Sequence, residues 1–337
     1  MTNLLALGLY AMSLGASGAA SLPVEPPAPV SLSEDEPVAP NLADPGTEIL
    51  TLETDRARRY TVPVMVEGAG PFDFMIDTGS QATAVTHQIN TQFNSGSGLT
   101  PSGRALLVGM ASTRPVDIVE VGSMSFGQHT VHDLLSPVLD ARHVGAEGII
   151  GLDSLQDLRV LIDFRAETIA LQDVSTIPNH RRGFEIVVRA RQKLGQLLVT
   201  NAMVEGVRAT VIIDTGAQAS IGSNALRERI RAKRAQEVTT TDVNGVSLVG
   251  QMQLVRSLEI EGLGLTNVPL TFADTPAFAA LGLADEPVLA LGMQHLRIFD
   301  RVAIDFSLQR ILFDVPRDVA RALRRARSAN VTRRFGR

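Results

Sequence analysis

Two aspartates in this chain lie in the same short sequence. Asp77 and Asp214 each follow a run of bulky apolar residues, and each precedes Thr-Gly and a small residue. A single Asp-Thr-Gly is typical of an ordinary turn, in which the aspartate caps the following backbone and the glycine takes a positive φ. Two matched carboxylates could instead act together, one as general base and one as general acid. Asp77 and Asp214 are therefore the candidates for chemistry.

The sequence around these aspartates is duplicated. Three pairs of segments correspond, namely 74–80 with 211–217, 148–152 with 289–293, and 160–164 with 302–306. The spacing between the copies changes by only a few residues from the first pair to the last, which indicates two copies of one unit with a small loop insertion. An isolated turn would need neither a matched partner nor the downstream apolar-apolar-Gly segments, which are Ile149-Ile150-Gly151 and Ala290-Leu291-Gly292. The duplication therefore favours a functional pair over two unrelated turns.

The elements that must position the pair are predicted to be strands. From about Glu48 onward, short runs rich in Val, Ile, Leu and Thr alternate with Gly, Asn and Pro, which is typical of many short strands. We predict an all-β (mainly β) fold with one lobe at residues 48–176 and a similar lobe at 183–316. Asp163 and Asp305 are also duplicated, and their place inside a strand predicts a structural hydrogen bond in each lobe.

The two ends of the chain differ in composition from the lobes. Residues 1–20 are mostly apolar and end in small residues, which predicts a signal peptide and a periplasmic or extracellular protein. No Lys or Arg precedes Leu4, so an uncleaved membrane anchor is the alternative. Residues 21–47 combine Pro with Asp and Glu and predict an extended linker. Residues 317–337 are Arg-rich and are interpreted as a solvated tail, with an anionic surface as the alternative partner.

Composition excludes several function classes. The 337 residues include no cysteine, which removes disulfides, thiolate metal sites and cysteine nucleophiles. A net charge of -5 gives no electrostatic footprint for nucleic acid. His129 and His132 have a spacing that could bind metal, but no third ligand is apparent, and His87, His143, His180 and His295 are isolated. We therefore expect neither a metal nor another cofactor.

The paired motifs resemble those of the aspartic proteases, both the two-lobed pepsin type and the retroviral type whose lobes are separate chains. The resemblance covers roughly residues 60 to 316. It implies two β lobes related by a pseudo-two-fold axis that brings Asp77 and Asp214 together above their apolar-apolar-Gly segments. Such paired acids share one proton and activate a water without a covalent intermediate. The implied function is an endopeptidase that needs no cofactor.

The same resemblance assigns roles to the neighbours of the two acids. Each threonine hydroxyl is expected to bond the opposite loop, and each glycine lets the backbone approach without a Cβ. Ser80 could donate a hydrogen bond to an ionised Asp77, whereas Ala217 could not do so for Asp214, so we place the charge on Asp77 and the proton on Asp214. The supporting residues are Thr78, Gly79, Ser80, Thr215, Gly216 and Ala217.

A peptide substrate is expected to lie extended across the cleft under covering loops. The candidates are residues 108–112, with Gly109 and Met110, and residues 243–247, where Asn244-Gly245 is a strong hairpin signal. Neither loop contains the tyrosine of the pepsin type, which moves the resemblance toward the retroviral type. Because both acids lie in one chain, we predict a functional monomer.

Two other functions are consistent with the sequence. The two-lobed scaffold could serve as a noncatalytic peptide-binding or assembly module, although both copies keep Asp, Thr and Gly. The other hypothesis is a processing enzyme that acts on one partner and is regulated by its N-terminal segment. Residues 21–47 contain no lysine that could reach the paired acids, which argues against an inhibitory role for them.

Overall fold

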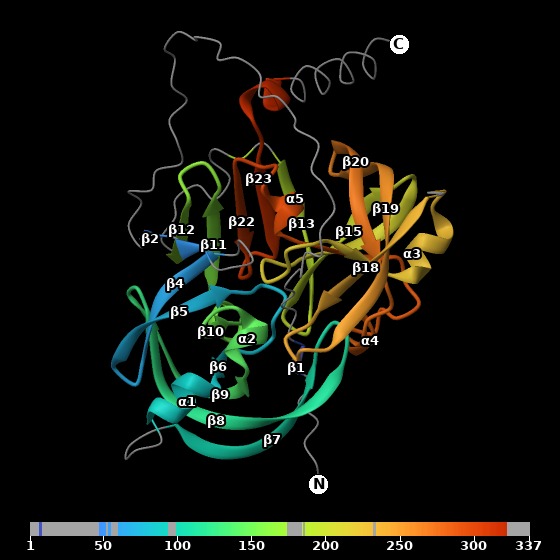
Figure 1. Ribbon diagram of the computed structural model, residues 1–337. Helices are drawn as coiled ribbons and strands as arrows, with labels where there is room; N and C mark the ends of the chain where they lie inside the picture. The colour runs from blue at the N-terminus through green and yellow to red at the C-terminus, as the bar shows by residue number, and fades with distance from the viewer. Residues whose placement is uncertain are drawn as a thin grey trace, which may run out of the picture.

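The computed structural model describes residues 7–8, 47–51, 53–54, 60–93, 99–173, 184, 186–231 and 234–321. Most of these residues lie in strands, and the predicted mainly-β fold of two similar lobes is confirmed (Figure 1). The linker at residues 21–47 lies outside the described residues except for Thr47. Most of the N-terminal segment and of the basic tail also lies outside them. The limits of the domains stay predictions.

The first lobe is built on a nine-stranded sheet in the order β1-β7-β8-β9-β6-β10-β5-β4-β3. Its strands are β1 (Leu7–Gly8), β3 (Glu53–Thr54), β4 (Tyr60–Val66), β5 (Ala69–Ile76), β6 (Ala84–Thr86), β7 (Thr100–Val108), β8 (Thr113–Phe126), β9 (His129–Leu139) and β10 (Gly148–Ile150). Short helices connect them, namely α1 (His87–Phe93), α2 (Ala141–Val144) and the 3-10 turn η1 (Leu152–Ser154). β1 lies parallel to β7, so a strand from the N-terminal segment occupies the edge of this sheet.

The second lobe repeats this arrangement with an eight-stranded sheet in the order β14-β15-β16-β21-β17-β20-β19-β18. Its strands are β14 (Arg191–Lys193), β15 (Gln196–Val204), β16 (Val207–Ile213), β17 (Ile221–Gly222), β18 (Ala235–Thr241), β19 (Ser247–Ile260), β20 (Leu263–Phe272) and β21 (Val288–Leu291). Its helices are α3 (Asn224–Arg229), α4 (Pro276–Ala280) and α5 (Met293–Leu296).

A third, six-stranded sheet joins the lobes in the order β13-β23-β22-β11-β12-β2. Its strands are β2 (Thr47–Thr51), β11 (Leu158–Asp163), β12 (Thr168–Asp173), β13 (Ile186–Arg189), β22 (Arg301–Asp305) and β23 (Arg310–Asp314). β11 of the first copy pairs antiparallel with β22 of the second, and Leu161 lies opposite Ala303. From the middle outward, β11, β12 and β2 of the first copy correspond to β22, β23 and β13 of the second. The pseudo-two-fold axis therefore passes between β11 and β22.

A buried ion pair crosses the same boundary. Arg159 of β11 donates to the carboxylate of Asp305 of β22 at 2.8 Å, and both side chains are almost completely buried. Asp305 also accepts from the backbone N–H of Leu308, as Asp163 accepts from that of Ala166. The predicted structural hydrogen bond of each duplicated aspartate is confirmed, and in the second copy the carboxylate also holds the lobes together.

The strands that lead to the candidate aspartates lie inside their sheets, with a paired strand on each side. β5 pairs in parallel with β10, and β16 pairs in parallel with β21. Strands covered on both faces read as continuous apolar runs, which explains Phe74-Met75-Ile76 before the first aspartate and Val211-Ile212-Ile213 before the second. The buried ends of two interior strands therefore deliver the two aspartates.

Candidate active site

Each candidate aspartate is the first residue after its strand. The backbone N–H of Asp77 donates to the carbonyl of Ile150 at 3.0 Å, and that of Asp214 donates to the carbonyl of Leu291 at 3.1 Å. These bonds connect each aspartate to the apolar-apolar-Gly segment of its own lobe. Both aspartates are buried, with 0% of Asp77 and 1% of Asp214 exposed.

The two threonines join the loops to each other. The hydroxyl of Thr78 donates to the carbonyl of Ile213 at 2.8 Å, and the hydroxyl of Thr215 donates to the carbonyl of Ile76 at 2.8 Å. The backbone N–H of each threonine also donates to the hydroxyl of the other, at 3.0 Å from Thr78 and 3.3 Å from Thr215. These reciprocal bonds between the lobes fix how far apart the two strand ends lie.

Gly216 lets the carboxyl group of Asp77 approach the loop of the second lobe. A Cβ placed on Gly216 would overlap the carboxyl group of Asp77, so the carboxyl group of the first loop lies against the backbone of the second. Within its own loop, Asp77 Oδ1 accepts from the backbone N–H of Gly79 at 2.8 Å. Asp214 Oδ1 accepts from the backbone N–H of Ala217 at 2.9 Å. Backbone donors therefore hold both carboxyl groups at the boundary between the lobes.

Ser80 does not have the role that its position in the sequence suggested. Its hydroxyl donates to the carbonyl of Ala82 at 2.7 Å, and only its backbone N–H, at 3.1 Å, donates to Asp77. The hydroxyl proton is therefore used to shape the loop. The assignment of the charge to Asp77 rested on that hydroxyl, and the bond to Ala82 removes this support.

A hydroxyl beneath each loop supports the apolar-apolar-Gly segment. Gly151 N–H donates to Thr83 Oγ1 at 3.0 Å, and Gly292 N–H donates to Ser220 Oγ at 2.9 Å. Ser220 Oγ also lies 2.7 Å from Nδ1 of the buried His295, and burial lowers the pKa of this histidine to about 4. The sequence analysis treated His295 as isolated and did not identify either hydroxyl. The two hydroxyls could have been found from the duplication, because Thr83 and Ser220 hold equivalent positions in the two copies.

The predicted covering loops are the turns between β7 and β8 and between β18 and β19. Figure 1 shows the β7–β8 hairpin reaching from the first lobe toward α4 of the second. Gly109 and Met110 lie in the first turn, and Asn244 and Gly245 lie in the second. The side-chain amide of Asn244 donates to the hydroxyl of Ser112 at 2.9 Å, so the two turns meet.

Asp242 is the residue at this meeting point that the sequence did not reveal. Its Oδ2 accepts from the backbone N–H of Ala111 at 3.1 Å and from the hydroxyl of Ser112 at 2.9 Å. Its Oδ1 accepts from the backbone N–H of Asn244 and Val246 in its own turn. Only 1% of Asp242 is exposed. Its position before the Asn-Gly pair was the available signal, because Asp commonly caps such turns.

Each covering loop places one apolar side chain in the opposite lobe. Met110, from the first lobe, belongs to the apolar cluster of the second lobe that contains Ile212 and Ala217 beside Asp214. Val243, from the second lobe, belongs to the cluster of the first lobe that contains Met75 and Ala82 beside Asp77. The tip of each covering loop is therefore part of the apolar core of the opposite lobe.

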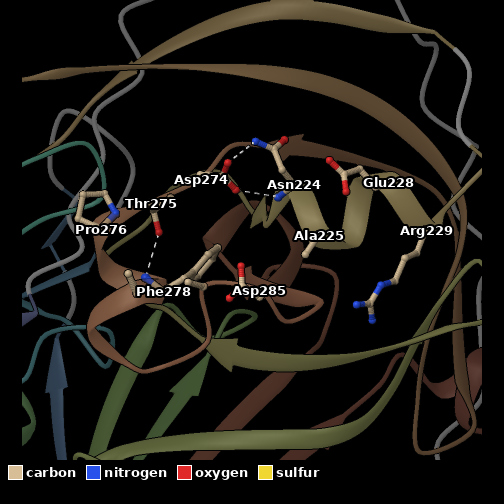
Figure 2. Close-up of a pocket in the computed structure, with 11 residues that line it drawn as sticks. Asn224, Ala225, Glu228, Arg229, Asp274, Thr275, Pro276, Phe278 and Asp285 are labelled. Atoms are coloured by element: carbon tan, nitrogen blue, oxygen red, sulfur yellow. Dashed lines mark hydrogen bonds between the residues drawn. The ribbon is translucent and has the colours of Figure 1, made fainter.

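A separate hollow lies between α3 and α4 of the second lobe (Figure 2). Asp274 accepts from the side-chain amide of Asn224 at 2.8 Å, and Thr275 Oγ1 accepts from the backbone N–H of Phe278 at 3.1 Å. These bonds belong to the starts of the two helices. The residues that line the hollow come from neither Asp-Thr-Gly loop and from neither covering loop.

The candidate metal ligands of the sequence lie away from the paired acids. His132 Nδ1 lies 3.3 Å from the carbonyl of Gly122, and the ring of His129 packs near Phe126. Within the described part of the chain, no three His, Asp or Glu side chains form a group that could hold a metal ion. The same residues include no helix with the length and apolar character needed to span a membrane.

Comparison with known proteins gives one result that covers both copies. Residues 62–154 and residues 200–294 each match the same family model, described as aspartyl protease. Each matched stretch contains one Asp-Thr-Gly and the apolar-apolar-Gly segment of its lobe. No curated protein matches the chain.

Proposed function

We propose that this chain, which belongs to the aspartyl protease family, is an endopeptidase in which Asp77 and Asp214 activate the water that cuts a peptide bond. Membership of the family supports a peptidase. The observation that carries the finer proposal is the reciprocal bonding of Thr78 and Thr215, which holds the two aspartate loops together across the lobes. A fold that used these aspartates only as turn caps would not need that contact.

The proposed chemistry follows from the proximity of two carboxyl groups. Two adjacent carboxylates cannot both ionise cheaply, so the pair keeps one proton, and aspartic proteases are the usual example of this effect. The ionised member takes a proton from water, while the protonated member polarises the scissile carbonyl. The water attacks that carbon, and the tetrahedral intermediate breaks down after a proton moves to the departing nitrogen. No covalent enzyme intermediate forms.

The substrate we propose is a protein or peptide segment in extended conformation. Extended peptides bind by adding a strand to an exposed sheet edge. The pairing of Leu7–Gly8 with Leu107–Val108 supports this mode, because it places an added strand on β7 next to the covering loop. Both aspartates lie in one chain, which supports a functional monomer. Neither nucleic acid nor a metal has a role in this proposal.

We also propose that the protein acts outside the cytoplasm. The apolar N-terminal segment and the small residues before Ser21 support export to the periplasm or the exterior, with retention of residues 1–20 as a membrane anchor as the alternative. Intact mass of the exported protein distinguishes the two, because cleavage removes the segment and retention keeps it.

The test is cleavage of a diverse peptide mixture between about pH 3 and 7, where carboxyl pairs change protonation. We expect the parent to cut at defined sites and Asp77→Asn to cut at none of them. Asp117→Asn is the matched control, because Asp117 forms an exposed ion pair with Arg104 on the strands of the first covering loop. A folded parent that binds peptides without cutting them would replace this proposal with the noncatalytic peptide-binding module.

A further inference from the structure

The two covering loops meet through side chains and not only through their backbones. One carboxylate, that of Asp242, accepts from Ala111 and Ser112 of the opposite loop on Oδ2 and from its own loop on Oδ1. Hydrogen bonds to a charged acceptor are stronger than those between neutral groups. Asp242 is buried and its bonds to the opposite loop are partly buried, so they are less exposed to water than bonds on the surface. One carboxylate therefore links the two loops.

Close approach of the two loops depends on a glycine. A Cβ on Gly109 would lie 2.6 Å from Asp242 Oδ2 and 3.2 Å from Asn244 Nδ2. A larger residue at Gly109 would push the first loop away from the carboxylate. On the other side, a Cβ on Gly245 would strike the ring of His143 in α2. Each loop tip is thus seated against the opposite lobe by its shape as well as by hydrogen bonds.

The closed loops also occupy the space beside the aspartates. Met110 and Val243 are 1% and 2% exposed, and each fills an apolar cluster of the lobe that it reaches. If the side chains of a substrate use these same clusters, which rests on the proposed function, the loop tips must withdraw before a peptide binds beside Asp77 and Asp214.

We propose that Asp242 is a positioning residue that ties the two covering loops into one lid, so that the cleft opens when the bonds from Ala111 and Ser112 to Asp242 break. Opening does not leave the carboxylate without donors, because the backbone N–H groups of Asn244 and Val246 remain bonded to it. The closed and open states can therefore both be stable. The apparent affinity for substrate is then the intrinsic affinity multiplied by the fraction of molecules that are open.

The role in peptide cleavage rests on the proposed function, but the lid itself can be tested without any cleavage. Because the chain contains no cysteine, a single introduced thiol reports on one position. Val243→Cys places a thiol of similar size in the closed lid, where a thiol reagent reaches it only after opening. Val160→Cys in β11 is the matched reporter of global unfolding, because Val160 is completely buried in the sheet that joins the lobes.

Removing the hydrogen bond from the Ser112 hydroxyl to Asp242 should accelerate thiol labelling in the lid but not in the sheet that joins the lobes. We expect Ser112→Ala to increase the labelling rate at Val243→Cys at least about tenfold, the effect of one hydrogen bond to a charged group, and to leave the rate at Val160→Cys unchanged. Ser102→Ala changes an exposed serine of β7, the strand that leads to the same turn, and should change neither rate. Equal rates with and without Ser112, or a parallel increase at both reporters, would overturn the proposal.

A covalent lock gives a second measurement. The side chains of Asn244 and Ser112 are in contact, with Nδ2 2.9 Å from Oγ, so mild oxidation of the variant that carries Ser112→Cys and Asn244→Cys can join the two turns, and a count of free thiols measures how much disulfide forms. We expect the oxidised protein to lose peptide cleavage and the reduced protein to recover it. Cleavage by the fully oxidised protein would contradict the lid. If the parent cuts no peptide but the labelling results hold, the proposed function fails and the lid stands.

Discussion

The hydroxyl of Thr78 donates a hydrogen bond to the carbonyl of Ile213, and this 2.8 Å contact joins the loop that carries Asp77 to the strand that delivers Asp214. The contact is repeated in reverse by Thr215 and Ile76. Because both bonds are buried, the separation of the two aspartates is fixed by the core of the protein and not by the covering loops.

Replacing Thr78 with valine should reduce both stability and peptide cleavage. Valine has a similar shape but no hydroxyl, so the buried carbonyl of Ile213 and the backbone N–H of Thr215 lose a partner. A buried group left unsatisfied costs about 1–3 kcal/mol. Thr78→Ser keeps the hydroxyl and serves as the control. Thermal unfolding and initial cleavage rates measure the effect, and equal behaviour of the two variants would contradict it.

Gly216→Ala should prevent the aspartates from occupying their present positions. The new methyl group would overlap the carboxyl group of Asp77, which cannot move without losing its bond from Gly79. We expect cleavage to fall by at least about a hundredfold, the order expected for a small misplacement of reacting groups. Gly264→Ala is the matched control, because a Cβ there meets open space. Rates measured on one peptide decide between the outcomes.

The stability of the protein should fall in acid because of His295. Burial lowers its folded pKa from 6.5 to about 4, so the unfolded chain binds a proton that the folded protein does not. This contribution is fully present above pH 6.5 and is lost progressively as the pH falls toward 4, by about 3 kcal/mol in total. His295→Gln should flatten the denaturant-unfolding profile over this range. His87→Gln, at an exposed position, is the control and should leave the profile unchanged. A parent profile that is flat between pH 6.5 and 4 would contradict the role of His295.

Because of the ion pair between the lobes, replacing Asp305 should destabilise the protein far more than replacing Asp163, its equivalent in the first copy. Asp305→Asn leaves the charge of Arg159 buried without its carboxylate, which costs about 3–5 kcal/mol when a buried pair is broken. The side chain of Asp163 is more exposed and accepts hydrogen bonds from backbone N–H groups of its own turn. Asp163→Asn should therefore lower the free energy of unfolding much less. Urea unfolding of the two variants provides the comparison, and similar losses would show that the ion pair does not hold the lobes together.

The sequence predicted the elements that repeat and missed the contacts that do not. The duplication of Asp77 and Asp214, with their strands and apolar-apolar-Gly segments, was enough to predict two β lobes, because repeated buried runs leave a clear pattern. The palindromic interlobe sheet was not predicted, since β11 and β22 are far apart in the sequence. Strand pairing over such distances leaves no local signal.

The side-chain contacts of the site also leave no local signal in the sequence. The hydroxyl of Ser80 could reach either Asp77 or the carbonyl of Ala82, and only the turn of the loop decides in favour of Ala82. Asp242 has no equivalent aspartate in the first covering loop, so comparing the two copies could not reveal it. The Ser220–His295 contact joins residues whose equivalents in the first copy are Thr83 and Ser154, so the histidine had no matching signal.

The central claim is that Asp77 and Asp214 act as one catalytic unit. The most direct measurement compares kcat/KM on a single cleaved peptide for Asp77→Asn, Asp214→Asn and the variant that carries both changes, with folding checked by thermal unfolding. Because groups that act as a unit lose their effect together, we predict that either single change lowers kcat/KM as far as the double change does. A single variant that keeps cleaving at the parent rate, or losses that multiply in the double variant, would contradict the account.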